Sequence, residues 1–71
     1  MLNKTYKIVD VVGVSEEGVD HAIRNALAKA RQTLRNIDWF EVGNIRGATQ
    51  GTGLQFQVEL RIGFRLENDS V

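Results

Sequence analysis

The chain has 71 residues, which is enough for a single domain over residues 1–71. Nine basic and nine acidic side chains give a formal net charge of zero, so the basic excess typical of nucleic-acid-binding proteins is absent. No apolar run approaches the roughly 18 residues needed to span a membrane, and residues 1–5 show no apolar core of a secretion signal. We therefore expect a soluble cytoplasmic protein with no nucleic-acid or membrane partner.

Cysteine is absent from the chain and histidine occurs once. Disulfides and thiolate metal sites are therefore excluded, and no metal site is predicted. A chain of this length hides only about 60% of its unfolded surface when it folds. Self-association is the expected additional source of stability.

The first predicted element is a strand over residues 5–13, which are rich in β-branched side chains. Ser15 is the predicted N-cap of a following helix. Glu16 and Glu17 would lie in its first turn, where the helix dipole favours negative charge.

The second predicted element is an amphipathic helix that begins at Val19 and runs for about five turns. Asn36 is its expected end. The apolar stripe that predicts the helix consists of Val19, Ala22, Ile23, Ala26, Leu27, Ala30, Leu34 and Ile37.

Two further strands are predicted, over residues 39–47 and 54–67, with a glycine-rich turn between them. In the last strand apolar and polar residues alternate without a fault, which is typical of a strand with one buried and one polar face. Residues 68–71 are expected to be frayed.

These elements predict an α+β fold with the order β-α-β-β, in which three antiparallel strands wrap around one helix. A helix of about 20 residues is near 30 Å long, whereas the last strand would reach about 45 Å. The helix alone cannot cover that apolar face, so we expect other copies of the chain to bury the remainder.

Residue combinations typical of enzymes are missing from the sequence. His21, the only histidine, lies beside the apolar stripe and is expected at the surface. Ser15 has no histidine partner in a nucleophile motif. The glycines at 51 and 53 are too few for a dinucleotide loop. No catalytic residue is predicted.

The most informative segment is residues 38–42. Strand alternation turns Phe40 and Val42 toward the helix, so that Trp39 and Glu41 point to the polar face. Two interpretations of Trp39 stay open: packing in a subunit interface, or a platform for a flat ligand that a glutamine amide also binds.

Gly43 favours a β-bulge, which would shift the strand by one residue. Ile45 would then turn inward and Arg46 would join Trp39 on the polar face. There Arg46 could hold a phosphate or form a salt bridge with Glu41 or Glu59, and the sequence leaves both open.

Several motifs in series resemble the bacterial dodecins, and the similarity covers nearly the whole chain in order. The matching segments are Tyr6-Lys7, Val12-Gly13-Val14-Ser15, Asp38-Trp39-Phe40-Glu41-Val42, Ile45-Arg46-Gly47, Phe56-Gln57-Val58 and Gly63-Phe64-Arg65-Leu66-Glu67.

The resemblance implies a hollow homododecamer that binds flavin at its two-fold axes, with two flavin rings stacked between two tryptophans. Carried over by motif, Trp39 is the stacking residue and Gln57 binds the ring edge. Arg46 matches the position associated with the flavin phosphate, which favours FMN over riboflavin, although riboflavin is also a possible ligand. Asp38 and Arg65 are the remaining predicted cofactor-binding residues.

Family members also bind coenzyme A near basic surface residues. The resemblance therefore raises a coenzyme A site here, for which Lys29, Arg35 and Arg65 are candidates. Gln57 and Arg65 lie eight residues apart, or about 27 Å along one strand. If both touch one flavin, they belong to different protomers.

The sequence thus predicts a non-catalytic protein that stores and buffers flavin and quenches its photochemistry. The alternative is an assembly or partner-binding module without a cofactor, in which Trp39 packs in an interface. A flavoenzyme is disfavoured, because flavin rings stacked between two indoles leave no open face for a substrate.

Overall fold

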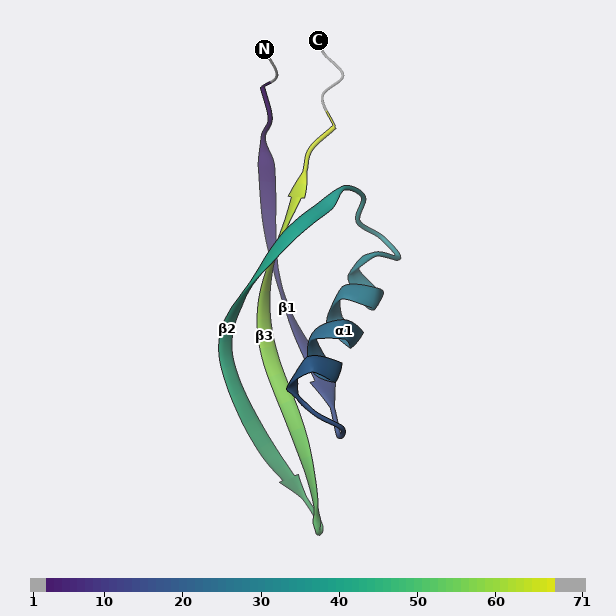
Figure 1. The fold of residues 1–71 in the computed structure, drawn as a ribbon, viewed down its shortest axis with the longest axis vertical. Coiled ribbons are helices and arrows are strands. Elements are labelled where there is room, and N and C mark those ends of the chain that lie inside the picture. The colour runs from purple at the N-terminus through teal and green to yellow at the C-terminus, as the bar shows by residue number, and fades with distance from the viewer. Residues whose placement is uncertain (1–2, 68–71) are drawn as a thin grey trace.

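The structure is a computed structural model that describes residues 3–67. It contains β1 (Tyr6–Ser15), α1 (Val19–Ala30), β2 (Ile37–Gln50) and β3 (Gly53–Arg65). The strands form one antiparallel sheet in the order β1-β3-β2, with the last strand in the middle (Figure 1). The expected α+β class, element order and hairpin of the second and third strands are confirmed. The expected frayed tail lies outside the described residues.

The helix is shorter than predicted. It ends at Ala30 after 12 residues, and the N–H groups of the next three residues bond to carbonyls of the last turn. Asn36, the predicted end, lies six residues after Ala30, where a φ of 63° places it in the left-handed region just before β2. Leu34 and Ile37 still pack against the core, but from the connecting loop and the start of β2.

The start of the helix also differs from the prediction. Ser15 is the last residue of β1 and Gly18 occupies the N-cap position. The Ser15 hydroxyl accepts a hydrogen bond of 2.9 Å from the main-chain N–H of Glu17. It therefore stabilises the turn before the helix, as serine does in local side-chain-to-backbone motifs. The acidic residue of the first helical turn is Asp20.

The core consists of small helix residues packed on aliphatic residues of the central strand. Gly13 of β1 permits this close approach, since a methyl group there would collide with the main-chain carbonyl of Ala22. The helix therefore lies directly on β1 and β3. The buried core residues are Ala22, Ala26, Ala30, Val58, Leu60 and Ile62.

Apart from its first residue, Ile37, strand β2 lies outside this core, because α1 packs against β1 and β3 (Figure 1). Phe40, Val42 and Ile45 pair with the three buried residues of β3 and share their face of the sheet. Their predicted inward orientation is confirmed, yet they remain 43%, 39% and 54% exposed. The single chain thus leaves an apolar surface along β2. No helix within residues 3–67 has the length and apolar character to cross a membrane.

Candidate functional site

The predicted site residues of β2 and β3 lie on the sheet face opposite α1, here called the outer face. The cross-strand pairs on this face include Arg46 with Gln57 and Trp39 with Gly63. Glu41 lies between them along β2, and its side chain is 3.7 Å from that of Arg61. The outer face therefore carries charged, amide and aromatic side chains on adjacent strands.

A β-bulge brings Arg46 to the outer face. The register between β2 and β3 shifts between Val42 and Ile45, which is the position that Gly43 predicted. Without the extra residue, strand alternation would turn Arg46 toward the helix side. A second shift, between Ile37 and Trp39, was not predicted from the sequence.

The first cluster of side chains on the outer face is the Arg46 cluster, formed by Arg46, Gln55, Gln57 and Glu59. Arg46 Nε donates to Gln57 Oε1 at 2.8 Å, and Arg46 Nη1 donates to Glu59 Oε2 at 2.7 Å. Gln57 Nε2 donates in turn to Gln55 Oε1 at 3.0 Å. Arg46 therefore forms one of the predicted salt bridges and also holds the amide of Gln57 in a fixed orientation.

Glu59 was not among the predicted ligand-binding residues. The hydrogen bond and positive charge of Arg46 hold the pKa of Glu59 below its usual value, against a smaller opposing effect of partial desolvation. The main-chain N–H of Asn44, within the bulge, lowers the same pKa further. Glu59 is therefore the ionised partner of Arg46 at neutral pH.

The second cluster is the Trp39 cluster, formed by Trp39, Gly63, Tyr6 and Asp38. The indole lies across Gly63, where any side chain would overlap the ring, and Trp39 remains 39% exposed. The rings of Tyr6 and Trp39 have centroids 6.3 Å apart. The Tyr6 hydroxyl donates to Asp38 Oδ2 at 2.6 Å. This hydrogen bond raises the pKa of Tyr6.

Sequence reasoning assigned no role to Gly63 or to the contact of Tyr6 with Asp38. A signal for Gly63 existed, since it is the one glycine in the polar row of the last strand. A glycine within a strand often marks a close approach of another group.

Arg65 lies at the Trp39 end of the sheet, where it pairs with Tyr6. The predicted site residues are thus divided between the two clusters. Gly63 and Gln57 are six residues apart on β3, or about 20 Å. We therefore expect that a single flat ring which touches both Trp39 and Gln57 takes them from two chains.

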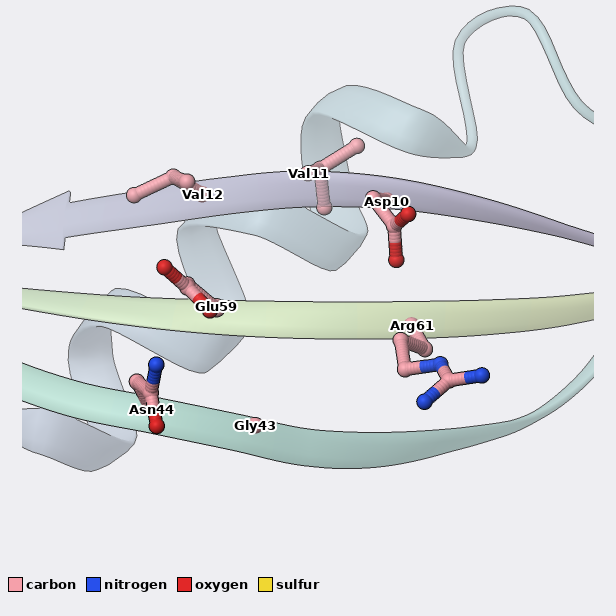
Figure 2. A pocket seen from close by; sticks show the side chains of 7 residues that line it. All are labelled: Asp10, Val11, Val12, Gly43, Asn44, Glu59 and Arg61. Carbon is pink, nitrogen blue, oxygen red and sulfur yellow. The ribbon is translucent and has the colours of Figure 1, made fainter.

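Between the two clusters the outer face has a depression of about 590 Å³. Figure 2 shows side chains of β1, β2 and β3 around it, with the carboxylates of Asp10 and Glu59 on the same side as Arg61. None of the predicted site residues lines it. The lining residues are Asp10, Val11, Val12, Gly43, Asn44, Glu59 and Arg61.

The basic residues considered for coenzyme A do not converge within one chain. Arg35 and Arg65 border one depression of about 250 Å³, whereas Lys29 borders another, beside α1 and β1. Arg35 also pairs with Glu67 at 3.3 Å. A coenzyme A site stays a prediction.

His21 has the surface position that the sequence predicts. Its side chain is 49% exposed and lies 3.4 Å from the carboxylate of Glu17, one helical turn earlier.

Comparison with known proteins gives one consistent family. The sequence model of the family described as Dodecin matches residues 5–67. A curated dodecin of Thermus thermophilus is 55% identical over 67 residues, which are 93% of this chain and 97% of the relative. A crystal structure of a Thermus thermophilus protein, 55% identical, has a TM-score of 0.88 and covers 93% of this chain and 98% of its own. The dodecin of Streptomyces coelicolor, 50% identical, has a TM-score of 0.89 and covers 97% and 100%.

Proposed function

The chain belongs to the dodecin family, and from this premise we propose that it binds and stores flavin without catalysing a reaction. The observation that carries the proposal is the position of Trp39. Its indole lies across the backbone at Gly63 and leaves aromatic surface exposed on the outer face, on the same face as the charged and amide side chains of β2 and β3. Such a surface favours stacking with a flat partner, and the ring system of a flavin is flat and aromatic.

The assembly that we propose is a homododecamer. Two observations support an assembly of several chains. Trp39 and Gln57 are about 20 Å apart within one chain, so a flavin that touches both takes them from different protomers. In addition, Phe40, Val42 and Ile45 are 43%, 39% and 54% exposed, so complete burial would stabilise each by roughly half of the ~1.5–3 kcal/mol that burying a fully exposed side chain of this kind contributes. Twelve copies of the 8.0 kDa chain would have a mass of about 96 kDa.

FMN is the flavin that we propose as the preferred ligand. Arg46 donates one hydrogen bond to Gln57 and one to Glu59, and a guanidinium has five N–H donors in all. The remaining donors are available to a phosphate, and hydrogen bonds between charged groups are the stronger ones. Riboflavin ends in a hydroxyl at this position and would bind through the ring contacts alone.

The proposed mechanism is quenching within a closed shell in the cytoplasm. An indole in contact with the ring would donate an electron to excited flavin and take it back, so that both groups would return to their ground states before oxygen could react. A ring stacked on both sides leaves no face for a substrate, which is why we propose a non-catalytic role.

The test is a titration of FMN into the purified protein, followed by flavin fluorescence. We expect strong quenching in the wild type and a loss of affinity of roughly 5- to 150-fold in Trp39→Ala, since stacking on one aromatic contributes about 1–3 kcal/mol. Trp39→Phe, which keeps a smaller ring, should lie between the two. Native mass spectrometry should show the same assembly in all three. If Trp39→Ala binds and quenches like the wild type, Trp39 is interface packing and the protein is an assembly module without a cofactor.

A further inference from the structure

We infer that Glu59 sets how strongly this site prefers a phosphorylated flavin, because Glu59 competes with the ligand phosphate for Arg46. The inference rests on the proposed function, since it concerns the same site. Arg46 is the cation that a flavin phosphate would need. In the structure its guanidinium already binds a carboxylate of the same chain.

The geometry of the ion pair makes this competition direct. Arg46 Nη1 lies 2.7 Å from Glu59 Oε2, which is the distance of a strong charge-assisted hydrogen bond. The side chains of Arg46 and Glu59 are 48% and 40% exposed. A ligand can therefore reach the pair, but it meets a guanidinium whose charge is already balanced.

The β-bulge in β2 also contacts Glu59. Glu59 faces the bulge, where a Cβ on Gly43 would lie 3.5 Å from its own Cβ. The main-chain N–H of Asn44 also favours the ionised carboxylate. The bulge that turns Arg46 to the outer face thus also places its competing anion.

The charges around the pair leave no surplus of positive charge for a phosphate. Asp10 and Arg61 line the same depression as Glu59 (Figure 2), and the cation beside Glu41 is Arg61, at 3.7 Å. Three carboxylates therefore share this part of the outer face with two guanidinium groups. A phosphate that binds Arg46 must displace Glu59 or lie beside it, and both lower its affinity. The neutral end of riboflavin avoids this effect.

The experiment measures the dissociation constants of FMN and riboflavin, at low salt, in the wild type, Glu59→Gln and Glu41→Gln. The first substitution keeps the length of the side chain and an acceptor for Arg46 while removing the charge. We expect the ratio of the riboflavin to the FMN dissociation constant to rise about ten-fold in Glu59→Gln, as removal of one adjacent like charge predicts. Glu41→Gln removes the same charge from the same face, but its partner is Arg61. The ratio should change there by about two-fold at most.

A double-mutant cycle tests whether Glu59 acts through Arg46. In an Arg46→Ala background, Glu59→Gln should no longer change the ratio. An unchanged ratio in Glu59→Gln alone overturns the inference and leaves flavin binding intact. An equal rise in Glu41→Gln, or a rise that persists without Arg46, also overturns it. If the wild type binds neither flavin, the proposed function itself has failed.

Discussion

The side chains on the two faces of β3 differ in their burial and in the contacts that they make. On the helix side, Val58, Leu60 and Ile62 have no exposed surface. On the outer face, Gln57 and Glu59 form hydrogen bonds with Arg46 and stay accessible to solvent. Each face of the sheet also has one glycine that another group approaches too closely for a side chain. These are Gly13 on the helix side and Gly63 on the outer face.

The difference between the two glycines lies in what approaches them. The neighbours of Gly13 are the main chain of Ala22 and the Cβ of Ala26, which belong to a packed helix. The neighbour of Gly63 is the side chain of Trp39, which is 39% exposed and can rotate away. We therefore expect substitutions on the helix side to affect mainly folding, and substitutions on the outer face to affect mainly the proposed ligand binding.

The largest effect that this comparison predicts is that of Gly13→Ala. The added methyl group would force α1 away from β1, and overpacking of this kind costs about 1–3 kcal/mol and sometimes more. We expect the free energy of unfolding to fall by about 3 kcal/mol or more, because the group that the methyl would strike is main chain and cannot rotate aside. Thermal unfolding followed by circular dichroism measures it. Gly47→Ala is the control, since a Cβ there would make only an ordinary contact of 3.6 Å with the Gln55 carbonyl. Equal stability of the two variants would contradict the comparison.

Gly63→Ala should leave folding and assembly nearly intact and weaken flavin binding. The new methyl group would displace the indole of Trp39, so we expect about a ten-fold loss of FMN affinity, within the range of losing one stacked aromatic. Trp39 is the only tryptophan, so a change in tryptophan emission reports its displacement directly. Gly47→Ala again serves as the control. If Gly63→Ala has the same tryptophan emission and FMN affinity as the wild type, the position of the indole does not require a glycine beneath it.

The fold could be predicted from the sequence wherever the spacing of apolar residues fits only one type of secondary structure. Strict alternation over residues 54–67 predicted β3 and the division of its faces, and Gly43 predicted the bulge. The helix length was not predictable in the same way, because Leu34 and Ile37 continue the helical spacing from a loop and a strand. The spacing of apolar residues indicates which residues reach the core. It does not prove that they are helical, because residues of a loop or a strand can make the same contacts.

The sequence predicted on which face of the sheet the site residues lie, but not which side chains they contact. Alternation and the bulge correctly placed Trp39 and Arg46 on the outer face. The choice among partners of Arg46 depends on the rotamers of long side chains, which no local pattern determines. The sequence therefore left the phosphate and the salt bridge as alternatives, and it gave no sign that Arg46 also holds the amide of Gln57.

The smallest predicted effect concerns the hydrogen bond between Tyr6 and Asp38, at the Trp39 end of the outer face. Ionising the phenol would break this bond of 2.6 Å and place an anion beside a carboxylate, so the pKa of Tyr6 lies above its ordinary value of 10.0. Nearby Arg65 opposes the shift only in part. A raised pKa in the folded state means that the bond stabilises the fold below pH 10.0 and that this contribution is lost as the pH rises through the folded-state pKa.

Tyr6 is the only tyrosine in the chain, so an ultraviolet absorbance titration follows its ionisation alone. We expect a midpoint above 10.0 in the wild type and a lower midpoint in Asp38→Asn, which keeps the shape of the side chain and removes its charge. Tyr6→Phe should abolish the transition and so confirm its origin. Because the contact is exposed, neither variant should shift thermal unfolding as Gly13→Ala does. An unchanged midpoint in Asp38→Asn would mean that Asp38 does not hold the Tyr6 hydroxyl in solution.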